Sequence, residues 1–165
     1  MGLDIYICKA KKEGLLEMQT KRTEIFNRIN DLRARKRTCK SSEWTSIDDE
    51  INDLFVEYDN YNPYSVVAEF RKANFLMNFF EYDGNCELKE ISRDEVELLL
   101  ENCVKVLNGH SLAGELLPTQ DGFFFGSTEY DDEYFYKVQD VLAKGSKILV
   151  ETDWENSVLY FEAWY

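Results

Sequence analysis

The sequence is poor in the residues that most often build metal sites and nucleophilic catalytic centres. It contains one histidine, His110, and four scattered cysteines, Cys8, Cys39, Cys86 and Cys103, with no CxxC spacing. A zinc site needs clustered Cys and His ligands, and a Ser/His/Asp or Cys/His arrangement needs a histidine beside its nucleophile. The sequence therefore predicts no metal and no cofactor, favours reduced thiols, and leans away from an enzyme.

Long apolar runs are also missing, and the start MGLDIYICKAKK lacks the basic segment of a signal peptide. We therefore expect no membrane segment and a cytoplasmic location. What is present is a hydrophobic fraction of 44% in 165 residues. That is enough for one packed domain without disulfides.

The formal net charge is −13, and it is unevenly distributed. Residues 9–40 hold 11 Lys or Arg and 4 Asp or Glu, a balance of +7, so the rest carries −20. Such an acidic body disfavours direct nucleic-acid binding and suits a partner protein with a basic surface, for which Asp48, Asp49 and Asp53 are candidate contacts. The alternative is that the acidity serves solubility alone.

Hydrophobic periodicity predicts an α+β fold in one domain, residues 1–165, with a small sheet of about four short strands packed by helices. The expected strands are 3–8, 86–91, 122–126 and 157–164. The expected helices are 12–38, a second starting at Ser46, 62–82, 92–107 and 131–147. The first two would form a protruding antiparallel hairpin over residues 11–58, with Leu15, Met18, Ile25, Ile29 and Leu32 along its apolar stripe.

Two signals mark helix starts. Ser92-x-x-Glu95 has the spacing of a capping box. Asn62-Pro63 places proline at a first helical position, and Val66, Phe70 and Ala73 would then share one apolar face.

Arg71, Lys72 and Asn74 form the first candidate site. Arg binds carboxylate or phosphate with two parallel donors, and Asn offers a donor and an acceptor. The alternative is a solvated helix face with Arg71 paired to an acidic neighbour such as Glu129 or Asp131.

Gly126, Ser127 and Thr128 follow an apolar stretch and precede a helix, with Tyr130 close behind. This order can present N–H groups and hydroxyls to an anion, facing Arg71 and Asn74 across a shared cleft. The alternative is a turn whose hydroxyl caps the helix.

Two further charge clusters have ordinary explanations beside functional ones. The carboxylates Glu129, Asp131, Asp132 and Glu133 can hold a divalent cation, but they also suit a helix N-terminus. The basic run Arg33, Arg35, Lys36 and Arg37 can touch phosphates, but cations are favoured near a helix C-terminus.

The start MGLDIY, the segment FRKAN at 70–74 and LLPTQDGFFFGSTEYDDEYF at 116–135 resemble a family of small phage and prophage proteins. The resemblance implies that Arg71, Lys72 and Asn74 share one site with Ser127 and Thr128. It also implies a phage-borne accessory role in a bacterial cytoplasm. Phe70 replaces the tryptophan of the family pattern, and Phe75, Leu76 and Met77 stand where a histidine often follows.

Three functions are consistent with these residues. The first is a non-enzymatic phage-type binding protein whose acidic surface mimics nucleic acid and inhibits a host defence protein. The second is a small-molecule binder that sequesters a nucleotide through Arg71, Asn74, Ser127 and Thr128. The third is a small metal-dependent enzyme that uses Glu129 and Asp131. The oligomeric state is open.

Overall fold

A computed structural model describes residues 2–84 and 87–165. The α+β prediction is confirmed: a four-stranded antiparallel sheet is packed with helices. The chain divides into two compact units, one of Met1–Ala10 and Ser65–Tyr165, called unit 1 here, and one of Lys11–Tyr64, called unit 2. Each unit has its own cluster of buried hydrophobic residues.

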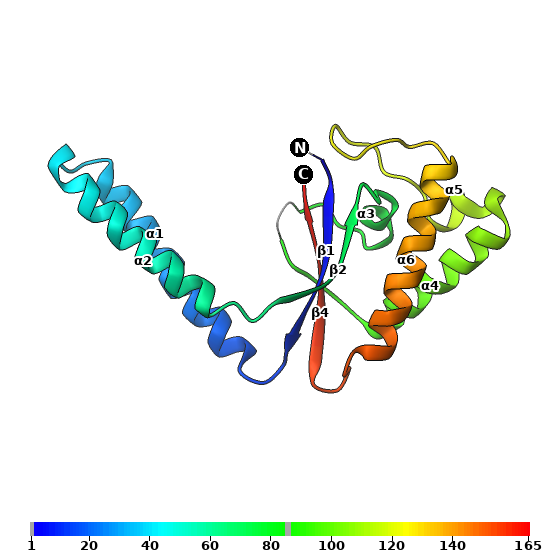
Figure 1. Cartoon of the computed structure of the whole chain (residues 1–165), viewed down its shortest axis with the longest axis horizontal. Helices are drawn as coiled ribbons and strands as arrows, with labels where there is room; N and C mark the ends of the chain where they lie inside the picture. Colours follow the sequence, from blue (N-terminus) through cyan, green and yellow to red (C-terminus); the bar gives the residue numbers. More distant parts are fainter. Residues whose placement is uncertain (1, 85–86) are drawn as a thin grey trace. The chain divides into compact units, whose positions relative to one another are not determined.

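The sheet of unit 1 has the strand order β2-β1-β4-β3. The strands are β1 (Asp4–Lys11), β2 (Ser65–Arg71), β3 (Lys89–Ile91) and β4 (Ser157–Trp164). Neighbours β1 and β2 pair antiparallel, with Asp4 opposite Arg71, and β3 pairs antiparallel with β4. Figure 1 shows the two chain ends side by side at one end of this sheet.

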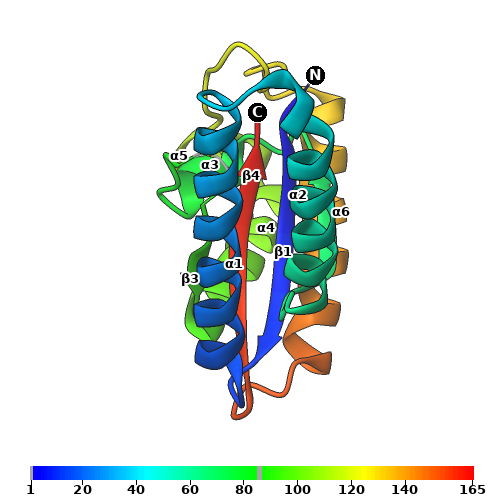
Figure 2. The same cartoon turned by 90° about the vertical axis from the view of Figure 1, so that its left-hand side faces the viewer.

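The side chains of each strand alternate between the two faces of the sheet, and one of these faces is buried. Ile5 and Ile7 of β1 are buried, as are Phe161 and Ala163 of β4, whereas Tyr6 between the β1 residues is only half-buried. Helices α4 (Arg93–Asn108) and α6 (Asp132–Glu151) cover the buried face, and Figures 1 and 2 show both on the same side of the strands.

Short elements complete unit 1: α3 (Phe75–Phe79), the 3-10 turn η2 (His110–Leu112) and α5 (Ala113–Leu116). The capping box at the start of α4 is confirmed. The Ser92 hydroxyl accepts from the Glu95 N–H, while the Glu95 carboxylate accepts from the Ser92 N–H at 2.7 Å. Asp131 caps α6 by accepting from the Tyr134 N–H at 3.0 Å.

The expected helix 62–82 is wrong. Residues 65–71 form strand β2, and only 75–79 are helical. Ala68 and Phe70 alternate with exposed neighbours in the strand, and the apolar residues after Phe70 belong to another element. The β-branched pair Val66-Val67 favours the strand, which gains backbone hydrogen bonds to β1.

The expected strand 122–126 is also wrong. These residues form a turn closed by the Phe125 N–H, which donates to the Gly122 carbonyl at 3.0 Å. Phe125 is buried, but Phe123 is 95% exposed. For the expected strand 86–91, residues 89–91 are β3, whereas Cys86 lies outside the described residues.

Unit 2 is a helical hairpin of α1 (Leu15–Lys36) and α2 (Trp44–Asn60), joined through the 3-10 turn η1 (Ser41–Glu43). Ile25, Ile29 and Leu32 are buried as predicted, whereas Met18 is exposed. The basic α1 pairs with the acidic α2: Arg28 binds Glu50 at 2.7 Å and Lys36 binds Asp48 at 2.6 Å. Arg22, in the apolar stripe, lies over the Tyr58 ring at 3.9 Å.

Candidate functional site

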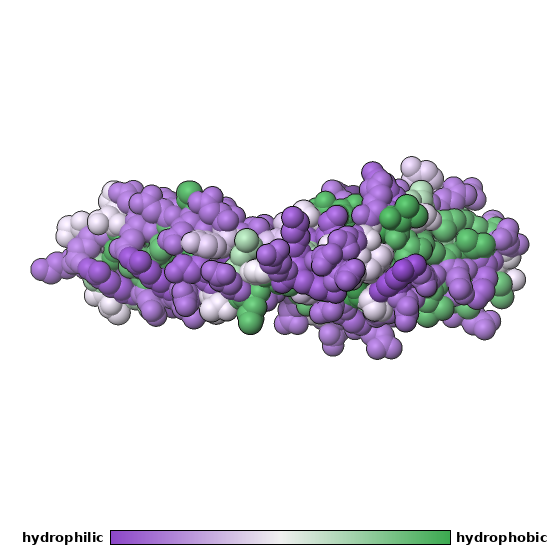
Figure 3. Space-filling view, turned by 90° about the horizontal axis from the view of Figure 1, so that it is seen from below, coloured by the Kyte–Doolittle hydropathy of each residue, from purple (hydrophilic) through white to green (hydrophobic). Residues whose placement is uncertain are grey.

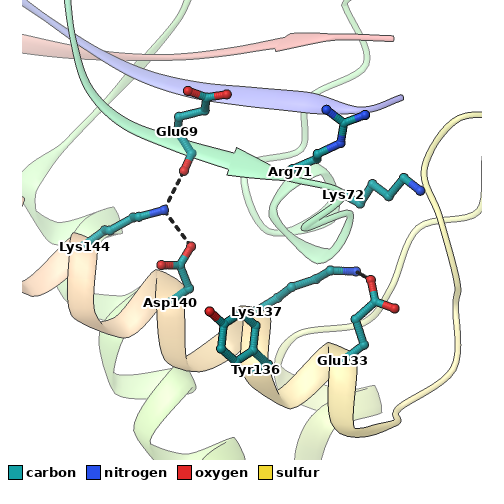
Figure 4. A pocket seen from close by; sticks show the side chains of 8 residues that line it. All are labelled: Glu69, Arg71, Lys72, Glu133, Tyr136, Lys137, Asp140 and Lys144. Carbon is teal, nitrogen blue, oxygen red and sulfur yellow. Dashed lines mark hydrogen bonds and ion pairs between the residues drawn. The ribbon is translucent and has the colours of Figure 1, made fainter. Parts of the chain in front are cut away.

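A cleft of about 630 Å³ in unit 1 gathers most of the charged groups that a ligand could use. It lies where the end of β2 faces the first half of α6 (Figure 4). Its lining consists of Glu69, Arg71, Lys72, Glu133, Tyr136, Lys137, Asp140 and Lys144. The lining therefore holds four cations, three carboxylates and one phenol, and Figure 4 shows the side chains of Glu69 and Arg71 on the side of β2 that faces away from α6.

Two of the cations are committed to neighbours. Lys144 donates to the Asp140 carboxylate at 2.7 Å and to the Glu69 carbonyl of β2 at 2.8 Å (Figure 4). Lys137 pairs with Glu133 at 2.8 Å, and its side chain is only 16% exposed. The Lys144–Glu69 contact joins α6 to β2, and the two carboxylates neutralise both lysines.

Arg71 and Lys72 are far less engaged. The Arg71 guanidinium is 68% exposed and lies 3.7 Å from the Asp4 carboxylate, outside hydrogen-bond distance. Lys72 makes no ion pair with any residue that the structure describes. Both side chains are therefore available to an anion.

Lys72 also has a left-handed backbone, with φ of 55°. A non-glycine residue pays roughly 1–3 kcal/mol for that conformation, and such strain concentrates at functional sites. The Lys72 N–H donates to the Leu3 carbonyl at 2.8 Å, and this hydrogen bond helps to stabilise the strained conformation. The stem of Lys72 packs over Gly126, whose own φ is 91° and where a Cβ would come within 3.3 Å of Lys72 Cδ.

Asn74 has a different position from the one predicted. It follows a strand instead of lying on the same helix as Arg71, and it is buried at 2% exposure. Its amide donates to the Ser127 carbonyl at 3.0 Å and to the Phe125 carbonyl at 3.4 Å. Asn74 therefore contacts the turn directly and braces it from inside.

The residues of the 126–130 segment lie beside the cleft but are not among those that line it. The Ser127 hydroxyl accepts from the Glu129 N–H at 3.1 Å, and the Thr128 carbonyl accepts from Thr119 at 3.0 Å. Tyr130 packs edge-on against Tyr134, with ring centroids 5.0 Å apart. Gly126 lies next to the stem of Lys72, which does line the cleft.

The carboxylate cluster is split by the fold. Glu133 lines the cleft, Asp131 caps α6, and Glu129 and Asp132 are exposed. Among residues 2–84 and 87–165, no group of three or more Cys, His, Asp or Glu side chains is arranged to hold a metal ion.

Some charged residues of unit 2 are paired with one another. Arg35 contacts Glu43 at 3.4 Å, and Asp48 is held by Lys36. Asp49 and Asp53 are exposed on α2. The partner-binding role predicted for Asp48, Asp49 and Asp53 therefore rests on the latter two, because Asp48 already has a counter-ion.

Sequence reasoning missed the α6 half of the cleft. Tyr136, Lys137, Asp140 and Lys144 fall in the expected helix 131–147, for which the sequence analysis predicts no site. Their signal was the repeated acid-to-lysine spacing of four residues, Glu133 to Lys137 and Asp140 to Lys144, which places ion pairs along one helix face.

A second hollow, of about 550 Å³, runs between α4 and α6. Its apolar lining is made by Leu100, Val104, Leu142 and Leu149, and its polar lining by Glu97, Glu101, Lys105 and Ser146. Figure 3 shows hydrophobic side chains gathered on the right-hand part of the molecule, where Figure 1 places these helices.

Three buried ionisable groups lie away from the cleft. Burial raises the pKa of the Cys8 thiol to about 11 and that of Cys103 to about 12. Burial also raises the pKa of Tyr134, whose hydroxyl donates to the Leu117 carbonyl at 2.8 Å. These groups are protonated at neutral pH and so are poor nucleophiles.

None of the described helices has the length and apolarity needed to cross a membrane. Comparisons of the chain with protein-family models, with curated proteins and with solved structures gave no match. The resemblance to phage proteins therefore stays a prediction, and the cleft between β2 and α6 is the feature on which a function can be argued.

Proposed function

We propose that the protein binds an anionic, phosphate-bearing small molecule in the cleft between β2 and α6. The observation that supports this most directly is the distribution of charge. Unit 1 has 9 Lys or Arg against 21 Asp or Glu, a net charge of −12. Four of those nine cations line this one cleft, together with three of the 21 carboxylates, so the lining carries a net charge of +1 within an acidic unit. Positive charge gathered in a hollow of an acidic body attracts anions to that hollow.

Arg71 and Lys72 make the new contacts in this proposal, while Lys137 and Lys144 stay paired with Glu133 and Asp140. A guanidinium recognises phosphate with two parallel hydrogen bonds. The strained backbone of Lys72 supports a functional role, because folding alone does not require a lysine there.

The test is isothermal titration of the full chain with inorganic pyrophosphate at low ionic strength. Arg71→Ala is expected to weaken binding by about tenfold or more, since a hydrogen bond to a charged group contributes roughly 1.5–3 kcal/mol. The melting temperature is expected to stay nearly unchanged, because an exposed pair contributes little to folding.

Arg93→Ala is the matched control. Arg93 is exposed on α4 and pairs with Glu97 at 2.8 Å, so its removal changes the net charge equally but outside the cleft. Equal weakening by Arg71→Ala and Arg93→Ala would show that only overall charge matters. No binding of pyrophosphate to the native chain would reject the proposal outright.

A second function has its own supporting observation. Outside the cleft, unit 1 carries 5 basic and 18 acidic residues, so the surface beyond it is strongly anionic. We propose that the apolar floor of the groove between α4 and α6, within this acidic surface, docks a basic protein. A phage-type accessory role in a bacterial cytoplasm, with inhibition of a nucleic-acid-handling host protein, follows from the resemblance described above.

This second proposal requires a partner that DNA displaces. Proteins captured on the immobilised chain from a bacterial lysate are eluted with duplex DNA. We expect the partner to be eluted from the native chain by DNA. We also expect the Val104→Glu variant not to capture it, because a carboxylate then lies in the apolar floor of the groove. A partner retained by Val104→Glu, or indifferent to DNA and to salt, argues against nucleic-acid mimicry.

A further inference from the structure

We infer that the ligand of the cleft carries an aromatic heterocycle that stacks on Tyr136, which makes it a nucleoside 5′-phosphate or a close relative. This inference rests on the proposed function, because it assigns the organic part of a ligand whose phosphate is held by Arg71 and Lys72. It adds Tyr136 and Asp140 as the residues that select the ligand.

The size of the cleft calls for an organic part. Its volume is about 630 Å³, within the range of roughly 300–1,000 Å³ that holds small organic ligands and cofactors. A phosphate group fills only a small part of that space. The rest of the ligand must lie along α6, where Tyr136 and Asp140 line the cleft (Figure 4).

Tyr136 differs from the two aromatic residues before it on α6. Tyr134 packs edge-on against Phe75, and Phe135 stacks on His110 with centroids 3.8 Å apart. Tyr136 is 69% exposed and contacts no other ring among the residues that the structure describes. A flat, uncovered ring beside cations is the arrangement on which nucleic-acid bases stack.

The carboxylate of Asp140 fits the same ligand. One of its oxygens, Oδ2, accepts from Lys144 at 2.7 Å. Its other oxygen, Oδ1, accepts no hydrogen bond from the described residues, and a carboxylate oxygen in a cleft for a bare phosphate would repel it. Ribose hydroxyls are donors that match this acceptor.

The experiment is a titration of the full chain with four probes: AMP, ribose 5-phosphate, adenosine and inorganic pyrophosphate. AMP is expected to bind at least fivefold more tightly than ribose 5-phosphate, because stacking a base on an aromatic side chain changes affinity by about 5- to 150-fold. Tyr136→Ala should reduce AMP affinity to that of ribose 5-phosphate and leave ribose 5-phosphate unchanged. Tyr136→Phe should keep the difference.

The outcomes separate this inference from the proposed function. Equal affinities for AMP and ribose 5-phosphate, with pyrophosphate still bound through Arg71, overturn the stacking inference alone. Binding of AMP that Tyr136→Ala leaves unchanged also overturns it. Failure of all four probes rejects both, and adenosine binding as tightly as AMP with no effect of Arg71→Ala rejects the phosphate site.

Discussion

At the scale of single residues, Lys72 is expected to favour ligand binding while its backbone conformation lowers the stability of the fold. Its left-handed backbone is costly for any residue with a Cβ, and glycine removes that cost. Lys72→Gly and Lys72→Ala both delete the side chain, but only glycine relieves the backbone. We expect the free energy of unfolding, measured in urea, to be about 1 kcal/mol higher for Lys72→Gly than for Lys72→Ala. Both variants should lose affinity for pyrophosphate. Equal stabilities would show that the conformation is unstrained.

Asn74 tests the opposite kind of residue, a buried polar group with a structural task. Asn74→Ala leaves the carbonyls of Phe125 and Ser127 without their buried donor, which costs roughly 1–3 kcal/mol. Asn78 is the control, since its amide also donates to two carbonyls but is exposed, so water can replace it. Urea unfolding should show a larger loss of unfolding free energy for Asn74→Ala than for Asn78→Ala. A loss no greater than that of Asn78→Ala would contradict the bracing role.

The buried thiols give a pH dependence with a definite sign. The unfolded chain ionises Cys103 near its ordinary pKa of 9.0, whereas the folded chain keeps the proton up to about pH 12. The folded state is therefore fully favoured below pH 9 and loses up to about 1.4 kcal/mol per pH unit above it. In urea unfolding at pH 8 to 10.5 with a reductant, Cys103→Ala should show a shallower decline than the native chain. A decline of unchanged slope would contradict this.

Sequence reasoning worked best where the signal is local. The Ser92-Glu95 box and the expected helix 92–107 depend on neighbours within one segment, and both agree with the structure. Residues 65–80 misled it because apolar residues of a strand, a turn and a short helix happened to fall at helical spacing. Whether such a segment pairs with β1 is decided by distant residues, which local spacing does not show.

The same reason explains the partial prediction of the site. Arg71 and Lys72 line the cleft, but the opposite wall comes from α6, whose position depends on how the helix packs against β2. The turn 126–128 lies beside the cleft without lining it, and Asn74 stabilises that turn from inside.

At the scale of helices, Gly145 allows α6 to approach α4 closely. A Cβ at this position would lie 2.7 Å from Leu100 Cδ2, too close for normal contact. We expect Gly145→Val to destabilise the protein by about 1–3 kcal/mol through overpacking. Ala143→Val, exposed on the same helix, is the control for the β-branched side chain. In a Leu100→Ala background, Gly145→Val should cause a smaller loss of stability. A loss of the same size would show that a clash with Leu100 is not its cause.

At the scale of the whole molecule, the hairpin is joined to the sheet in a way that makes it removable. Lys9 and Ser65 are paired across β1 and β2, so the chain leaves and returns at neighbouring points. Replacing residues 11–64 with a short Gly-Ser link should therefore leave a unit 1 that unfolds cooperatively in urea, because its buried cluster contains no residue of the hairpin. A truncated chain without a cooperative transition would show that the hairpin is part of one folding unit.

The contact between Lys144 and β2 also affects the edge of the sheet. Strand β2 is the last strand on its side, and edge strands offer free backbone groups on which strands of other molecules can grow. The ammonium of Lys144 occupies the carbonyl of Glu69 and adds a charge that an incoming strand would have to displace. We therefore expect Lys144 to disfavour the addition of a foreign strand at this edge.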